Sequence, residues 1–457
     1  MERETKVALL MAASLFMEIL DGTIVTVAIP RIGFSLSQST ATTSLLISVY
    51  LVTVAIFIPL SGWLAGRIGD KKIWLGAVAL FTISSLGSAL SPSFTVLLLM
   101  RILQGFSGSL MTPTARLIVL EKTIPSKLLK MISYLVWPAL IAPALAPLLG
   151  GILVTYWSWR WIFLINLPIG IVIFILGFHM LSNNRLEHKV PFDVVGFLEM
   201  ALSSSLIILG ADLATHPNVK WSMSISVFGS GLALFSVTFF HIVNCKNPIF
   251  KLSALKIPSF RISQTGGSIL WLSVGALPYL LTAYLQLILK WSALQAGEMV
   301  FFIFIGNIGM KPFTNKIILR LRYKNTLLTA LISIMTSGIL FAFVRPNTSV
   351  ILIAGLTTIS GMGRSLALTA YNGLSFTEVL FKDRGSANTL NSITQTLAQA
   401  LGISLITVLV HLLSIEMLLS SAYQYGFLFL GSILIIPIIE IVILPSSLGE
   451  SSLGGQI

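Results

Sequence analysis

The chain has 457 residues, of which 55% are hydrophobic and only 10% are charged, against roughly a quarter charged in an ordinary soluble domain. This composition excludes a soluble globular protein. Lys and Arg outnumber Asp and Glu by 29 to 16, but the basic residues stand singly between long apolar runs, which argues against a nucleic-acid-binding surface. The single cysteine, Cys245, and five histidines without H-E-x-x-H spacing argue against a disulfide framework, a thiolate metal site and a zinc hydrolase.

Apolar segments recur along the whole sequence at the length that crosses a membrane, which is about 20 residues. The first follows a charged N-terminus and has no signal-peptide cleavage site, so we expect it to be a membrane helix. Short polar loops separate fourteen such segments, which predicts an all-α integral membrane protein. The predicted spans are residues 7–29, 43–66, 73–91, 95–119, 131–154, 161–181, 194–214, 223–244, 262–289, 294–316, 326–344, 350–372, 387–412 and 425–444.

The basic residues predict how the segments are oriented. With a cytoplasmic N-terminus, only 5 of the 29 basic residues fall in outside loops, 4 lie within segments or at their ends, and the other 20 fall in inside loops. This asymmetry follows the positive-inside rule and predicts an even number of helices with both termini in the cytoplasm. The 5 outside residues are Arg31, Arg160, Lys220, Lys290 and Arg345, and the 4 associated with segments are Arg101, Arg116, Lys311 and Arg364.

Two charged loops divide the segments into six, two and six. We predict an N-terminal six-helix half over residues 1–181, an inserted helix pair with its flanking cytoplasmic loops over 182–261, and a C-terminal six-helix half over 262–457. Parallel six-helix repeats build one large class of secondary transporters. No Walker A string occurs in the sequence, so an ATP-driven pump would need a separate subunit.

The first segment carries two carboxyl groups at membrane depth. Glu18 and Asp21 are three residues apart and are therefore expected on one helical face, with Asp21 about 20 Å from the cytoplasmic end of a core about 30 Å thick. A low-dielectric site disfavours two neighbouring carboxylates, so we interpret them as a proton-coupling pair that takes up a proton near neutral pH. The alternative is a structural hydrogen bond or salt bridge that holds the helix in place.

The fourth segment carries a basic residue at a similar depth. Arg101 lies about six residues from the outer end of its segment, so Asp21 is its expected partner, because a buried guanidinium requires one. Protonation of Asp21 would release Arg101 and supply the two states that an antiporter needs, whereas a permanent ion pair is the alternative. Arg116, near the inner end of the same segment, is expected to extend to the membrane interface.

The fifth segment is unusual in its prolines and glycines. It contains Pro138, Pro143, Pro147, Gly150 and Gly151. Prolines remove helical hydrogen bonds and kink a helix, and a glycine pair permits close approach of another backbone. Such a helix could bend or seal a cavity between two states, or it could be a kinked packing helix.

The loop after the second segment, G-W-L-A-G-R-I-G-D-K-K (62–72), is a candidate gate. Its basic side chains could latch onto the cytoplasmic ends of neighbouring helices, although a short basic inside loop is also what the topology requires. The candidate gating residues are Gly62, Arg67, Gly69, Asp70, Lys71 and Lys72.

Polar and aromatic residues inside other segments are candidates for a substrate cavity. Arg364 and Asn372 lie in the twelfth segment, and Trp137 and Trp271 lie inside the fifth and the ninth, whereas most other tryptophans are at segment ends. Ordinary packing is the alternative for the two tryptophans.

Several of these strings together resemble the major facilitator superfamily, in its fourteen-helix branch of drug:proton antiporters, over almost the whole chain. The strings are L-D-G-T-I-V-T-V-A-I-P (20–30), R-I-L-Q-G-F-S-G (101–108), A-P-A-L-A-P-L-L-G-G (142–151), W-R-W-I-F-L-I-N-L-P-I-G (159–170), P-F-D-V-V-G (191–196), Gln286 before K-W-S-A-L-Q-A-G, and G-M-G-R-S-L-A-L-T-A-Y-N (361–372). The resemblance implies that Asp21 is the branch's membrane aspartate and that Arg101 is its proton-coupling arginine. It also makes Gln286 a cavity candidate and implies an antiporter motif at Pro143, Pro147, Gly150 and Gly151.

The sequence departs from the family pattern at four positions. In the loop that resembles the gating motif, Gly66 stands where an aspartate is expected and Asp70 where a base is expected, which implies a rearranged latch. Ala146 replaces a glycine of the antiporter motif, and Thr26 replaces an asparagine common in the first helix.

These observations together predict a proton-driven exporter of drugs or metabolites that works by alternating access. We expect a monomer in a bacterial inner membrane that binds a small molecule and protons, with no cofactor, no bound metal and no enzymatic activity. The carboxyl groups suit lipophilic cations, whereas basic residues at membrane depth, among them Arg364 and Lys311, suit an anionic metabolite or a metal chelate. Proton-coupled uptake and a membrane sensor without transport are the alternatives.

Overall fold

The computed structural model describes residues 3–38, 40–123, 125–182, 191–214, 219–291 and 293–444, and the secondary structure of these residues is helical throughout. Helices are expected because the membrane core offers no water, so the backbone must form its hydrogen bonds within each segment. The helices are α1 (Arg3–Ser35), α2 (Thr40–Ile68), α3 (Asp70–Ala89), α4 (Phe94–Lys122), α5 (Pro125–Tyr156), α6 (Trp161–Leu164), α7 (Asn166–Met180), α8 (Val194–Leu213), α9 (Trp221–Asn244), α10 (Pro258–Leu287), α11 (Ala293–Phe341), α12 (Val350–Thr377), α13 (Arg384–Glu416), α14 (Leu419–Ser432) and α15 (Ile435–Ile443), with short 3-10 helices at Leu252–Lys256 and Phe381–Asp383.

Twelve stretches of the described residues are long and apolar enough to cross a membrane, and the second part of α5, Ile141–Tyr156, is a shorter apolar helix. Helices α6 and α7 together form one such stretch, and so do α14 and α15. The stretch in α11 has 47 residues, which would be about 70 Å long at about 1.5 Å per residue, more than twice the membrane core.

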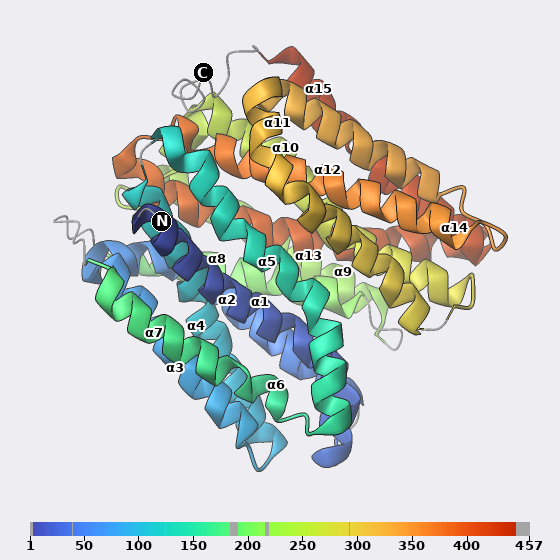
Figure 1. Cartoon of the computed structure of the whole chain (residues 1–457), viewed down its shortest axis with the longest axis horizontal. Coiled ribbons are helices and arrows are strands. Elements are labelled where there is room, and N and C mark those ends of the chain that lie inside the picture. The colour runs from blue at the N-terminus through green and yellow to red at the C-terminus, as the bar shows by residue number, and fades with distance from the viewer. Residues whose placement is uncertain are drawn as a thin grey trace.

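Helix α11 is in fact two spans. Arg322 has non-helical backbone angles, φ 62° and ψ 172°, and α11 turns back on itself along its course (Figure 1). With α11 divided and α5 included, the described residues contain fourteen spans, as predicted.

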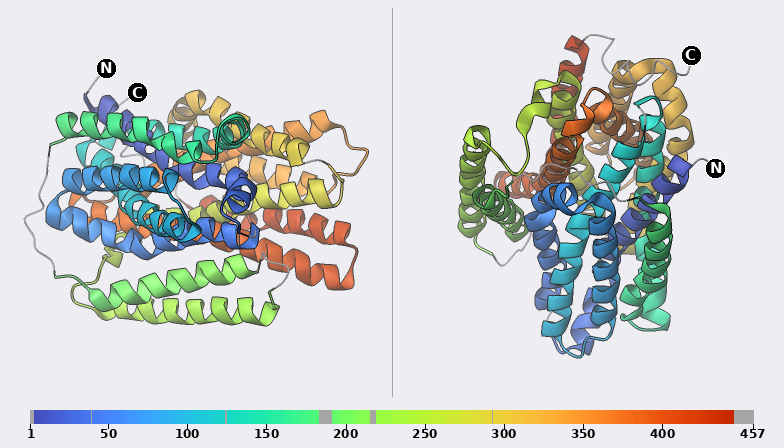
Figure 2. Two further views of the ribbon diagram at one scale, coloured as in Figure 1. Left: turned by 90° about the horizontal axis from the view of Figure 1, so that it is seen from below. Right: turned by 90° about the vertical axis from the view of Figure 1, so that its left-hand side faces the viewer.

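The spans form three groups that follow the chain. Helices α1 to α7 pack together, with α1 against α5 and α4, while α10 to α15 form a second group in which α10 packs against α13 and α11 against α12. Helices α8 and α9 pack mainly on each other at the side of the bundle (Figure 2), and α8 also packs against α2 and α13. Helix α5 continues without interruption past its prolines, and it bends along its course (Figure 1).

The two large groups meet at the end of the bundle where the chain starts. There the side chain of Arg384 donates to the carbonyl oxygen of Leu120, and Asn388 Nδ2 donates to the carbonyl oxygen of Pro113 at 2.8 Å. Beside them, Ser133 Oγ donates to Asn315 Oδ1 at 2.7 Å. The groups diverge toward the opposite end (Figure 1). The end where the chain starts is therefore the closed end of the bundle in this conformation.

Candidate functional site

Asp21 of α1 and Arg101 of α4 form a buried ion pair. Arg101 Nη1 lies 2.5 Å from Asp21 Oδ2, and both side chains are 0% exposed. This pairing is the one that their similar depth predicts. A charged pair in such surroundings is costly to desolvate, and removing one partner would leave an uncompensated charge.

Two amides complete the hydrogen bonds of the carboxylate. Asp21 Oδ1 accepts from Asn166 Nδ2 at 2.7 Å and from Gln104 Nε2 at 3.2 Å, and Gln104 Oε1 in turn accepts from Arg101 Nη1 at 3.0 Å. Ser85 Oγ accepts from Gln104 Nε2 at 2.8 Å, which ties α3 to the same network. Gln104 and Asn166 are not among the residues predicted from the sequence, although Gln104 lies three residues after Arg101 and therefore on its face of α4.

Helix α2 supports the guanidinium from the other side. Arg101 Nε donates to the carbonyl oxygen of Leu46 at 3.2 Å, and the guanidinium lies 4.3 Å from the ring centroid of Tyr50, a favourable cation–π distance. The network thus joins α1, α2, α3, α4 and α7 within the N-terminal group. A change of charge on Asp21 would therefore act on five helices at once.

A separate cavity of about 430 Å³ lies between the two groups. Residues of α1, α2, α4, α5, α10, α11, α12 and α13 line it. Glu18 is one of them, and its carboxylate accepts a hydrogen bond from the hydroxyl of Thr112 on α4. Asp21 and Arg101 do not line this cavity. The two carboxyl groups predicted to share one face therefore lie in different environments.

Three of the five predicted cavity residues line this cavity, namely Trp271, Arg364 and Asn372. Trp137 and Gln286 do not, and the Trp137 side chain is 38% exposed on the surface of the bundle.

The prediction for Arg116 was wrong. Instead of extending to the interface, Arg116 lines the cavity, and both of its terminal nitrogens lie 3.4 Å from Gln395 Oε1 of α13. The cavity offers a polar partner within the bundle, so the side chain does not need the membrane surface. Gln395 Nε2 continues the chain of hydrogen bonds to Asn372 Oδ1 at 3.1 Å.

The proline and glycine motif of α5 contributes to the cavity wall and to the packing of α5 against α1. Pro143 lines the cavity, and Gly150 packs on α1, since a Cβ atom at this position would lie 2.9 Å from Ile24 Cγ1. A Cβ atom on Gly151 would have no atom within 4 Å. Of the two glycines, only Gly150 therefore packs against a neighbouring helix. The side chains of Pro138 and Pro147 lie outside the described residues.

The candidate gating loop makes contacts with both groups of helices. Lys71 Nζ donates to the carbonyl oxygen of Phe178 at the end of α7 at 2.7 Å. Gly69 has a positive φ of 103° at the start of α3, which favours glycine. A Cβ atom on Gly62 would collide with the hydroxyl of Thr389 on α13, so Gly62 packs closely on that helix.

The charged residues of this loop differ in their surroundings. Asp70 is buried and accepts a hydrogen bond from its neighbour's main chain, Lys71 N, at 2.7 Å. Arg67 lies 5.1 Å from the ring centroid of Trp63, and Lys72 is exposed. Of these charged side chains, Lys71 is the one whose hydrogen bond to α7 the structure describes.

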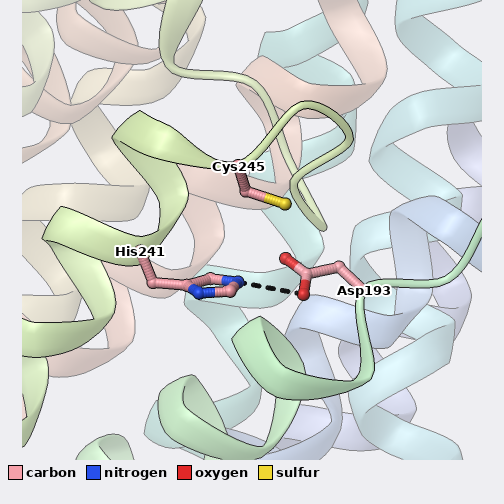
Figure 3. Close-up of side chains that lie close together, drawn as sticks. All are labelled: Asp193, His241 and Cys245. Atoms are coloured by element: carbon pink, nitrogen blue, oxygen red, sulfur yellow. Dashed lines mark hydrogen bonds and ion pairs between the residues drawn. The ribbon is translucent and has the colours of Figure 1, made fainter.

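A second side-chain cluster lies where α8 begins and α9 ends. The donor atoms of Asp193, His241 and Cys245 all lie within 4.8 Å of one another, and His241 Nε2 is 3.1 Å from Asp193 Oδ1 (Figure 3). Both carboxylate oxygens already accept main-chain hydrogen bonds, from Gly196 N at 2.8 Å and from Ile249 N at 3.2 Å. Because both carboxylate oxygens already accept hydrogen bonds, we interpret the cluster as a structural contact that connects α8 to the loop after α9 and not as a metal site.

Comparisons with known proteins agree with this architecture. The family model of the Major Facilitator Superfamily matches residues 11–402. The MdtD protein of Salmonella paratyphi A, a relative named for multidrug resistance, is 31% identical over 397 residues, which cover 87% of this chain and 84% of the relative. The crystal structure of the human organic anion transporter MFSD10 (TETRAN) has a TM-score of 0.69 at 14% identity, covering 96% of this chain and 100% of that chain.

A symporter structure has the same fold. The proton:xylose symporter XylE has a TM-score of 0.68 at 12% identity, and the match covers 98% of this chain and 97% of that chain. At these identities the solved structures show the fold alone, whereas the family model and the relative extend over most of the sequence. The chain therefore belongs to the Major Facilitator Superfamily, and it is a multi-pass membrane transporter and not an enzyme.

Proposed function

We propose that this transporter is a proton-driven exporter of small molecules that works by alternating access. The observation that carries the proposal is the ion pair between Asp21 and Arg101, which is 0% exposed and lies outside the cavity. A proton can therefore act on the helices without occupying the space where a substrate binds. The relatives named for multidrug resistance support export of small molecules.

The coupling step follows from the contacts of the pair. Protonation of Asp21 removes the charge that compensates Arg101, so the guanidinium loses its only ionic partner among the described residues and the network that joins five helices is released. Deprotonation on the other side restores the pair. Two arrangements of the same helices, selected by one proton, are what alternating access requires.

The available driving force is sufficient for useful export. One charge that moves through 100 mV supplies about 2.3 kcal/mol, which corresponds to roughly fortyfold in concentration at about 1.4 kcal/mol per decade. We place the protein in a bacterial inner membrane, as a monomer, where an inside-negative potential draws protons inward.

Proton exchange in proteoliposomes tests the proposal. Vesicles that contain the pH dye pyranine receive a panel of aromatic cations, neutral compounds and anions, and protein-free vesicles correct for passive permeation. Antiport is expected to make the lumen more alkaline as a compound enters, and Asp21→Asn is expected to lose this response. Arg345→Gln, in an exposed loop, is the control variant and should respond like the natural protein. Acidification of the lumen would indicate symport, and the proposal of an exporter would be wrong.

A further inference from the structure

The cavity between the two groups of helices has an unbalanced set of charges. Its lining contains one carboxyl group, Glu18, and two guanidinium groups, Arg116 and Arg364. Lining residues such as Trp271 and Phe304 provide apolar surface beside them. The cavity therefore presents more positive than negative charge to whatever enters it.

Arg364 is a buried cation whose partners are all neutral. Its side chain is 3% exposed, Nη2 donates to the carbonyl oxygen of Ser273 at 2.9 Å, and Nη1 donates to that of Val274 at 3.3 Å. Nε is buried and has no hydrogen-bond partner among the described residues. The structure thus leaves one guanidinium donor of the cavity wall without an acceptor.

Arg116 is equally short of negative charge. Its described hydrogen bonds are two long ones, of 3.4 Å each, to the neutral oxygen Gln395 Oε1. Arg101 in the same helix shows the contrast, because it has a carboxylate at 2.5 Å. No carboxylate lies within 4 Å of Arg116 or Arg364 in the described part of the chain.

Two further polar groups of the cavity wall lack partners. Asn307 Oδ1 and Ser392 Oγ are buried without a hydrogen bond among the described residues, and both residues line the cavity. A buried polar group without a partner is destabilising, so these groups, together with Arg364 Nε, favour a ligand that brings hydrogen-bonding oxygens.

We propose that the cavity binds the anionic group, a carboxylate, of a small amphipathic substrate through Arg364 and Arg116, with its apolar body against Trp271. A guanidinium binds a carboxylate with charge-assisted and often bidentate hydrogen bonds. The inference rests on the proposed function, in which this cavity is the transport site. It assigns the charge of the substrate, which proton coupling at Asp21 leaves open.

Three probes that share a naphthalene ring and carry a negative, a neutral or a positive polar group test the inference without any mutation. The purified full-length protein in detergent is titrated with 2-naphthoate, 2-naphthamide and 2-naphthylmethylammonium, and binding is measured by isothermal titration calorimetry. The carboxylate is expected to bind at least about tenfold tighter than the amide and the ammonium compound. Equal binding of the three probes, or tighter binding of the ammonium compound, would overturn the inference.

Variants of the natural protein locate the binding site. Arg364→Gln and Arg116→Gln are each expected to weaken 2-naphthoate binding about tenfold or more and to weaken 2-naphthamide binding much less, because the amide carries no charge. Arg345→Gln, in an exposed loop, should bind all three probes like the natural protein. If neither cavity variant alters the preference for the carboxylate, Arg116 and Arg364 do not hold it and the inference fails.

The Asp21→Asn variant separates this inference from the proposed function. It should still bind 2-naphthoate, because Asp21 does not line the cavity. A natural protein that prefers the carboxylate but exchanges no protons would contradict the proposed function alone. Proton exchange that depends on Asp21, together with a preference for the ammonium probe, would contradict only the anionic substrate.

Discussion

Glu18 and Asp21 lie three residues apart on α1, yet the Glu18 side chain lines the cavity while Asp21 is enclosed in the network around Arg101. A helix turns by about 100° per residue, so this spacing separates two side chains by about 60° around the axis. That angle is enough to place one carboxyl group at the cavity between the two groups of helices and the other in the interior of the N-terminal group. The two positions are therefore expected to have different mutational phenotypes.

Asp21→Asn is expected to abolish proton-coupled exchange, because the amide cannot take up or release a proton. It should also lower stability, since breaking a buried ion pair typically costs about 3–5 kcal/mol. Glu18→Gln should retain proton coupling with altered substrate affinity. Pyranine-loaded proteoliposomes and thermal unfolding in detergent measure the two effects separately.

The double variant Asp21→Asn with Arg101→Gln distinguishes coupling from a fixed structural pair. Removing both charges leaves no uncompensated ion, so thermal stability should recover by a large part of the loss seen for Asp21→Asn alone. Proton-coupled exchange should stay absent. If the double variant regained exchange together with stability, the pair would be structural and the proton would bind elsewhere.

Gly150→Ala is expected to impair transport and to lower stability by about 1–3 kcal/mol, a typical effect of overpacking. A methyl group there would meet Ile24 Cγ1 at 2.9 Å, whereas one on the adjacent Gly151 would meet nothing within 4 Å. Gly151→Ala is therefore the matched control and should behave like the natural protein. Equal loss in both variants would mean that backbone flexibility, and not contact between α5 and α1, is what the motif provides.

The charge moved in each transport cycle depends on the charge of the substrate. With one proton per cycle, exchange for a monovalent cation moves no net charge, and exchange for a monovalent anion moves two. The anionic substrate inferred for the cavity therefore predicts exchange of 2-naphthoate that a membrane potential accelerates strongly. Currents on a solid-supported membrane measure the charge moved during exchange. Exchange of 2-naphthoate without a current would contradict an anionic substrate.

Asp193→Ala is expected to destabilise the protein by about 1 kcal/mol without changing substrate affinity, because Asp193 Oδ1 accepts from Gly196 N at the start of α8. Cys245→Ser should leave both stability and transport unchanged, since the carboxylate keeps its main-chain donors. Thermal unfolding of the two variants gives the comparison. A larger loss of stability in the Cys245 variant would mean that the thiol, and not the carboxylate, connects α8 to the loop after α9.

The spans and one buried contact could be predicted from the sequence because membrane burial imposes simple rules. A window of about 20 apolar residues marks each span, and the polar string R-L-R-Y-K-N (320–325) marked the turn that divides α11. The pairing of Asp21 with Arg101 followed from depth alone, since few acids are available in the membrane core.

The rest depended on rotation about helix axes and on partners from distant segments. Arg116 was expected at the interface because nothing in its own segment predicts Gln395 of α13 as its neighbour. Gln104 and Asn166 were not predicted because an uncharged amide in an apolar segment is a weaker indication of a site than a charged side chain. Glu18 and Asp21 were assigned to one site because spacing along a helix does not say which face meets which neighbour.

The closed end of the bundle is held by acceptors that do not titrate. The side chains of Arg384 and Asn388 on α13 bond to the main-chain carbonyl oxygens of Leu120 and Pro113 on α4. No proton can weaken such an acceptor in the physiological range, so protonation of the acceptors does not break these contacts, and in the proposed cycle the proton acts at Asp21 instead. The acceptors also belong to the backbone, so substitutions on α13, and not side-chain changes at positions 113 and 120, remove these bonds.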